Sequence, residues 1–93
     1  MRSIEVEIRM ATGLHARPAA DFVRAAGGFA STIRIENLTG RRPPANAKSI
    51  TSVLAAGAES GHIVKITAEG PDEEQAVETL VELLAGLDEP VGR

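Results

Sequence analysis

The stretch SIEVEIRM, residues 3–10, alternates polar and apolar side chains one by one. Its apolar members are Ile4, Val6, Ile8 and Met10. Successive side chains of a β-strand point to opposite faces, so this period of two predicts a strand with one buried face. The stretch is the clearest strand of the sequence, and it supplies one wall of a core.

After this strand the apolar residues take up a helical spacing. A helix is predicted over residues 16–26, and its apolar face consists of Ala19, Phe22, Val23 and Ala26. Gly27-Gly28 follows directly. Because glycine adopts the backbone conformation that ends many helices, this pair is interpreted as a helix stop.

Two strands are predicted in the middle of the chain. Residues 32–36 alternate again and form the second strand. The third should run from Arg42 to Ala47. Pro43 and Pro44 cannot donate hydrogen bonds to a neighbouring strand, so this strand must be short and lie at the sheet edge.

A short helix and a fourth strand follow. Ser49 is a good N-cap for a helix of about two turns, which Gly57 can close. The segment from His62 to Glu69 is rich in β-branched residues and alternates, as a strand does.

The last helix is predicted after the Gly70-Pro71 break. Asp72 can cap it in a capping box with Gln75, and Gly86 can end it. Residues 87–93 are expected to be frayed. The buried stripe of this helix is expected to be Val77, Leu80, Val81 and Leu84.

The resulting order, βαββαβα, predicts a single domain over residues 1–93. Helices gathered on one face of a mostly antiparallel sheet make an open-faced α/β (α+β) sandwich. Many binding domains share this architecture, so the fold alone does not name a function.

Composition narrows the classes of protein. The chain has no cysteine, 43% hydrophobic and 25% charged residues, and a net charge of −3. The hydrophobic and charged fractions are typical of a globular protein. The absence of cysteine excludes disulfides and thiolate metal sites. No targeting signal or apolar run of about 20 residues is present, so a soluble cytoplasmic protein is expected.

The charge is unevenly distributed along the sequence. Residues 1–68 carry +4 and residues 69–93 carry −7, and the acidic run is interpreted as a solvated helix face. The basic part favours an acidic partner or an anionic group. Nucleic acid is a poor candidate, because the cations are scattered and no aromatic residues lie among them.

The segment TGLHARPA, residues 12–19, carries the chemistry. It lies where the first helix should start, and the free N–H groups of Ala16 and Arg17 could bind an anion there. Arg17 opposes the helix dipole, which makes sense if an anion lies beside it. His15 brings a nitrogen nucleophile, and Pro18 should keep the His15–Arg17 segment extended.

The two histidines also have simpler interpretations. His15 could be an ordinary capping or surface residue, and His62 is expected to be a strand or turn residue. The chain lacks a second histidine at metal-ligand spacing and a companion carboxylate for a Ser-His-Asp arrangement. No metal site or hydrolytic triad is therefore expected.

The motif GLHARPA, residues 13–19, closely resembles the phosphorylation-site motif of the HPr family, which belongs to the bacterial phosphoenolpyruvate-dependent sugar phosphotransferase system. The stretch NAKSI, residues 46–50, resembles the segment that carries the family's regulatory serine. The resemblance covers nearly the whole chain. It implies an open-faced sandwich with a four-stranded antiparallel sheet and three helices on one side.

The resemblance also implies roles for individual residues. His15 would accept a phosphoryl group on Nδ1, Arg17 would steady it, and Ser49 would be the regulatory site, used by an HPr kinase/phosphorylase where one exists. Enzyme I would be the donor, itself charged by phosphoenolpyruvate, and enzyme IIA domains the acceptors. The implied partner-binding residues are Leu14, Ala20, Arg24, Lys48, Ile50, Thr51 and Leu54.

Such a carrier is not strictly an enzyme, needs no cofactor of its own, and is expected to be a monomer. Two features depart from the family pattern: the loop Arg41–Pro44 is longer than usual, and Thr51 replaces a bulkier apolar residue. The alternatives kept open are a nitrogen-related regulatory branch of the same family and a pure α/β binding module. Ser49 could also be only a helix cap.

Overall fold

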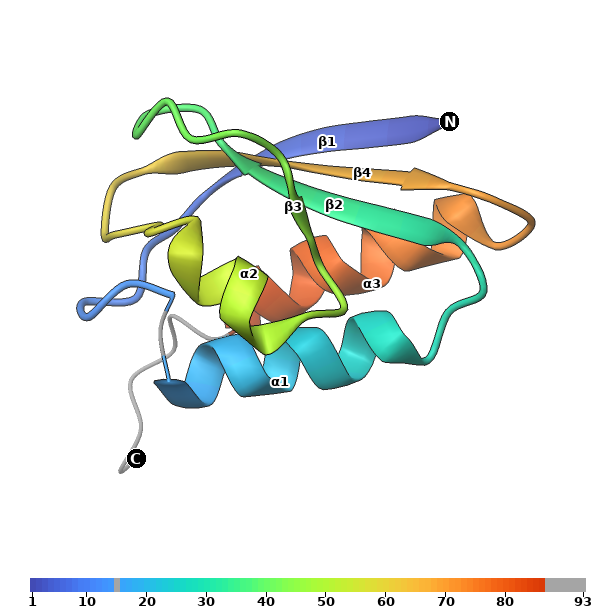
Figure 1. Cartoon of the computed structure of the whole chain (residues 1–93), viewed down its shortest axis with the longest axis horizontal. Coiled ribbons are helices and arrows are strands. Elements are labelled where there is room, and N and C mark those ends of the chain that lie inside the picture. The colour runs from blue at the N-terminus through green and yellow to red at the C-terminus, as the bar shows by residue number, and fades with distance from the viewer. Residues whose placement is uncertain (15, 87–93) are drawn as a thin grey trace.

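The computed structural model describes residues 1–14 and 16–86 (Figure 1). The predicted order βαββαβα is confirmed in this part of the chain. The elements are β1 (Arg2–Glu7), α1 (Ala16–Gly27), β2 (Thr32–Asn37), β3 (Ala45–Asn46), α2 (Ile50–Ala55), β4 (Ile63–Glu69) and α3 (Glu73–Gly86). His15 and the carboxy-terminal segment expected to be frayed lie outside the described residues. No described helix has the length and apolar character needed to cross a membrane.

The four strands form one antiparallel sheet in the order β1-β4-β2-β3. The three helices cover one face of it and leave the other open, which confirms the expected sandwich (Figure 1). The register places Ile66 of β4 between Ile4 of β1 and Ile35 of β2. Ile35 and Ile66 are fully buried, so this row of side chains forms part of the wall beneath the helices.

The open face of the sheet is polar. Lys65 lies between Glu5 and Glu36 in the register, and its ammonium is 3.8 Å from the Glu36 carboxylate. Charged and hydroxyl side chains that alternate with the buried ones are typical of a solvated sheet face.

The helices bury the predicted stripes except at Val23 and Val81, which are half-buried. Phe22 of α1 is fully buried against the sheet, and so are Val77 and Leu80 of α3. The acidic run of α3 is exposed as expected, at Glu74, Glu78 and Glu82.

Two strands are shorter than predicted. β1 ends at Glu7, and although Ile8 and Met10 are buried, they lie beyond it. β3 has only two residues, since Pro43 and Pro44 precede it without N–H groups to pair. The residues predicted to end β1 and to begin β3 therefore belong to loops. The loop after β1 leads into α1.

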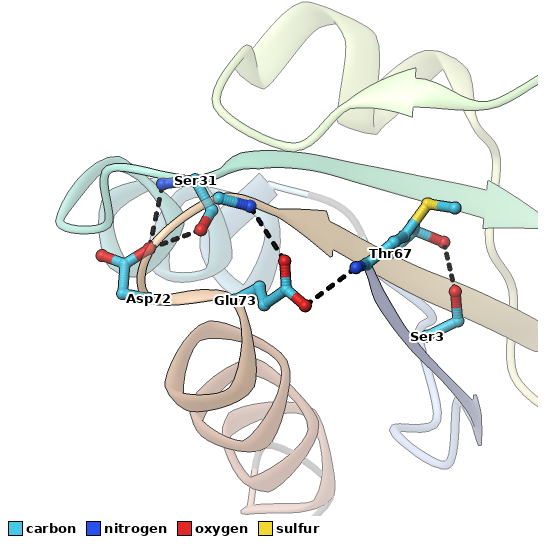
Figure 2. Close-up of polar contacts among 7 residues, drawn as sticks. Ser3, Ser31, Thr67, Asp72 and Glu73 are labelled. Carbon is cyan, nitrogen blue, oxygen red and sulfur yellow. Dashed lines mark hydrogen bonds and ion pairs between the residues drawn. The ribbon is translucent and has the colours of Figure 1, made fainter.

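The start of α3 differs from the predicted capping box. Asp72 holds the N-cap position, because its carbonyl accepts the N–H of Ala76 at 2.9 Å. Its carboxylate does not form the capping box predicted with Gln75. It accepts hydrogen bonds from Ala30 and Ser31, in the loop before β2. Glu73 instead accepts the N–H of Gly70 at 3.1 Å (Figure 2).

Candidate functional site

The backbone just before α1 is held against the loop that precedes β4. The N–H of Gly13 donates to the Met10 carbonyl (3.0 Å), and the N–H of Leu14 donates to the Ala58 carbonyl (2.8 Å). Gly13 has a φ of +78°, and a Cβ there would lie 2.8 Å from the Ala58 oxygen. Only glycine fits this turn, which fixes the chain immediately before position 15.

Leu14 adds a side-chain anchor to this backbone anchor. It is 2% exposed and belongs to the core cluster with Val53 and Phe22. The resemblance places Leu14 on the partner-binding surface, but its side chain is instead buried. Leu14 therefore anchors the segment before α1 to the hydrophobic core.

The amino terminus of α1 is open to solvent. The helix begins at Ala16, and both Ala16 and Arg17 are exposed. Arg17 is helical, so the extended conformation expected from Pro18 is wrong for this residue. The first turn of α1 contains no acidic residue, so no carboxylate of that turn neutralises the positive end of the helix.

Ala16 carries backbone strain at the same place. Its φ is +28°, an uncommon value for a residue with a Cβ. Such outliers persist where the surrounding structure imposes them, and they cluster at functional sites. The anchors at Gly13 and Leu14 and the helix that follows are the surroundings that impose it here.

These features make the start of α1 suited to an anion. His15 lies outside the described residues, but its chain neighbours are Leu14 and Ala16, at the start of the helix. Free N–H groups and the Arg17 guanidinium are suited to phosphate oxygens. Among residues 1–14 and 16–86, no group of His, Cys, Asp and Glu side chains could hold a metal ion.

Ser49 caps α2, as predicted. Its Oγ accepts the N–H of Ser52 at 3.3 Å, and its carbonyl accepts the N–H of Val53 at 2.9 Å. The residue is half-buried and lies in an extended conformation. The helix that it caps runs beside α1 (Figure 1).

The other predicted partner-binding residues on α1 and α2 are exposed or half-buried. Ile50 and Leu54 are large apolar side chains of α2 that are 39% and 41% exposed. Thr51 and Arg24 are exposed as well, and Ala20 is half-buried. The guanidinium of Arg24 is 3.2 Å from the Asp21 carboxylate on the same helix.

Lys48 has a different environment from these residues. It is half-buried, and its ammonium donates to the Phe29 carbonyl at 2.7 Å, just past the end of α1. Lys48 therefore connects the β3–α2 segment to the far end of α1, away from Arg17.

A hollow of about 350 Å³ lies between the segment before α1 and the end of α2. Its lining includes Leu54, whose side chain is exposed on α2, and residues of the segment just before α1. Its lining residues are Ala11, Thr12, Leu14, Leu54, Gly57, Ala58, Glu59 and Ser60.

The structure also shows a polar cluster that the sequence did not reveal. Asn37 is 1% exposed, and its amide nitrogen donates to the Ala56 carbonyl (2.9 Å) and lies 3.1 Å from Nδ1 of His62. The N–H of Glu59 also donates to that Nδ1, at 3.2 Å. Two donors on Nδ1 assign the ring proton of neutral His62 to Nε2.

One hydrogen bond of this cluster is indicated by the local sequence. The Asn37-Leu38-Thr39-Gly40 turn explains why the N–H of Gly40 donates to the Asn37 side chain. Nothing local indicated the contacts across to α2 and β4. Arg42 was likewise missed: its guanidinium donates to the Ala55 carbonyl (3.3 Å) and so complements the carboxyl end of α2.

Comparison with known proteins gives the family context. The family model described as PTS HPr component phosphorylation site matches residues 2–86. The phosphocarrier protein HPr of Haemophilus influenzae is 43% identical over 88 residues, which cover 95% of this chain and all of that protein. The multiphosphoryl transfer protein of Vibrio cholerae is 47% identical over 83 residues, but this chain spans only 21% of its length.

Solved structures agree with the sequence comparison. The crystal structure of HPr from Thermoanaerobacter tengcongensis is similar with a TM-score of 0.89 and 42% identity. That match covers 98% of this chain and all of the other.

Proposed function

The chain belongs to the family of PTS HPr components, and we propose that it is a phosphocarrier that accepts a phosphoryl group on His15 and passes it on. The observation that carries this proposal is the position of Arg17. It lies exposed in the first turn of α1, without an acidic residue in that turn, two residues after the histidine. A cation at this end of a helix opposes the dipole, and a bound phosphoryl group would compensate for it.

The transfer is a nucleophilic displacement at phosphorus. The lone pair on Nδ1 of neutral His15 forms the new N–P bond, while the bond from phosphorus to the donor breaks and its electron pair stays with the donor. Arg17 and the free N–H groups of the helix start stabilise the charge on the equatorial phosphoryl oxygens. The reverse displacement by an acceptor returns His15 to its starting state.

Enzyme I is the proposed donor, and enzyme IIA domains are the proposed acceptors. Ile50 and Leu54 supply an exposed apolar centre on α2, and Arg24 is exposed on α1, which contacts α2. Apolar contacts give a docking surface its affinity, and a cation at its edge speeds encounter with an acidic partner. The relatives named HPr and multiphosphoryl transfer protein favour this role over the nitrogen-related branch.

Ser49 is the proposed regulatory site. Its hydroxyl already accepts an N–H at the start of α2, and a phosphate could accept the same bond. The fold should therefore tolerate the modification, and its effect should fall on docking. A phosphate beside Ile50 would add negative charge to the surface that an acidic enzyme I approaches.

The central test is phosphorylation by enzyme I and phosphoenolpyruvate, followed by mass spectrometry of the intact protein. One phosphoryl group should be added, in an acid-labile and base-stable linkage. His15→Ala should remove it, and His62→Gln should keep it, because Nδ1 of His62 already accepts bonds from Asn37 and Glu59. Equal labelling of wild type and His15→Ala would refute the proposal.

A further inference from the structure

A second hollow, of about 240 Å³, lies where β3 ends and leaves part of the β2 edge uncovered. Two cationic side chains line it, Arg34 from β2 and Lys48 from the segment after β3. No acidic residue is among its lining residues, which are Ala30, Ser31, Thr32, Ile33, Arg34, Asn46 and Lys48. The proposed carrier function assigns no role to this hollow.

Lys48 is held in place without a counter-charge. Its ammonium donates one hydrogen bond to the Phe29 carbonyl, and an ammonium has three N–H donors. No ion pair formed among the described residues includes Lys48. Two donors and a full positive charge therefore remain on a half-buried, oriented side chain.

Arg34 likewise forms no ion pair within the described part of the chain. Its register partners are Thr67 on β4 and Asn46 on β3, both neutral. Lys65, one row further along the same face, lies between two glutamates and pairs with one of them. The contrast shows that the sheet neutralises one of its cations and leaves Arg34 available.

Asn46, which also lines the hollow, adds a neutral donor. Its side-chain oxygen accepts the N–H of Lys48 at 2.9 Å, which leaves the amide NH₂ group for a ligand. Two carboxylates lie near the hollow: Glu69 is the register partner of Thr32, and Asp72 bonds to the N–H of Ala30 and to both polar hydrogens of Ser31. Ser31 thus offers nothing to a ligand, and the donors are those of Arg34, Asn46 and Lys48.

Because the donors of Arg34, Asn46 and Lys48 line one hollow, we infer that it binds a small phosphate-type dianion, either inorganic phosphate or a small phosphate monoester. A planar guanidinium fork and an ammonium are the usual donors for phosphate oxygens. The hollow is smaller than the roughly 300–1,000 Å³ of sites for drug-sized ligands, so the ligand must be small. The phosphate monoester would place its phosphate between the two cations.

This site is separate from the one proposed at His15. Lys48 contacts Phe29 beyond the carboxyl end of α1, whereas Arg17 lies in its first turn. At 1.5 Å per residue, the 12 residues of α1 separate the two ends by about 18 Å. A ligand at one end would leave the amide signals at the other unchanged.

The test is a ¹⁵N NMR titration of the whole chain at constant ionic strength. Inorganic phosphate in one arm and glycerol phosphate in the other should shift the amides of residues 30–34 and 46–48 in a saturable way. Stronger binding of glycerol phosphate would identify the monoester as the better ligand. Shifts confined to residues 14–18, or shifts that rise linearly without saturation, would overturn the inference.

Arg34→Gln is the decisive variant, because Arg34 is exposed and its replacement should not disturb the fold. It should weaken phosphate binding by about three- to fivefold or more, the effect of removing one exposed charge contact. Arg41→Gln removes the same charge at the other end of β2 and should bind phosphate as the wild type does. Equal affinities of wild type and Arg34→Gln would also overturn the inference.

Discussion

The carboxylate of Asp72, at the start of α3, accepts hydrogen bonds from the hydroxyl and the backbone N–H of Ser31, which lies 41 residues earlier in the chain (Figure 2). Its other oxygen accepts the N–H of Ala30 at 2.8 Å. Gly70 permits this approach, since a Cβ there would lie 2.7 Å from Cα of Ser31. One carboxylate thus connects the loop before β2 to the last helix.

Asp72→Asn should therefore lower stability, and the loss should depend on pH. The hydroxyl of Ser31, followed by the N–H of Ala30, holds the pKa of the Asp72 carboxyl below its ordinary value. Its contribution is fully present above the unfolded-state pKa of about 3.9 and is lost as the pH falls through the lower folded value. Urea unfolding of wild type and variant should show a gap near neutral pH that closes in acid.

Glu74→Gln is the control for this measurement, because Glu74 is an exposed acid on the same helix. It should change the urea midpoint little at either pH. A gap between wild type and Asp72→Asn that stays constant through the acid range would show that the charge of Asp72 is not the cause.

Gly13→Ala should slow phosphorylation of His15 while the protein remains folded. The new Cβ would meet the Ala58 carbonyl at 2.8 Å in a backbone conformation that alanine rarely adopts, a strain of about 1–3 kcal/mol. The turn must shift, and the position of His15 with it. Gly27→Ala is the matched control, since nothing lies within 4 Å of its Cβ position, and it should be labelled at the wild-type rate.

Arg17→Ala should leave the fold intact and raise its stability slightly, because a cation is removed from the positive end of α1. It should raise the barrier to phosphoryl transfer by about 1–3 kcal/mol, the range of a charge-assisted hydrogen bond. Single-turnover labelling at saturating phosphorylated enzyme I measures this step. A wild-type rate in the folded variant would remove Arg17 from the site.

Arg24→Ala provides a useful contrast in the same assay. Arg24 lies two turns further along α1, so its loss should act on encounter with the partner rather than on transfer. The rate should fall at low enzyme I concentration and recover at saturation, and the defect should shrink in high salt.

Ser49→Asp should keep the helix cap but slow labelling of His15 by enzyme I at low salt. Aspartate caps helices as well as serine does, and its charge would repel an acidic partner. Ser49→Ala should lose about 1 kcal/mol of stability with the cap but be labelled normally. If all three proteins are labelled equally at low salt, Ser49 serves only as a cap.

Asn37→Ala should destabilise the fold by about 1–3 kcal/mol, the usual cost of leaving buried polar groups unpaired. The variant removes the donors to Ala56 and His62 and the acceptor for Gly40. Thermal unfolding would measure the loss. Asn46→Ala, which removes a single exposed contact, should cost less, and an equal cost would contradict a special role for the buried amide.

The sequence alone predicted the elements and their order. The period of two at Ile4 and Val6 and the helical spacing at Phe22 and Val77 depend only on neighbours along the chain, and the structure confirms them. The cap at Ser49 is local in the same way. The motif around Arg17 likewise located an exposed helix start, because the residues that make it are consecutive.

Only the tertiary structure decided which distant groups meet. Asp72 reaches Ser31, Lys48 reaches Phe29 and Asn37 reaches Ala56, although each pair is separated by 19 to 41 residues. The burial of Leu14 and the early end of β1 were settled in the same way. Periodicity reports which face of an element is apolar, whereas these contacts depend on how the finished elements pack and which buried polar groups need partners there.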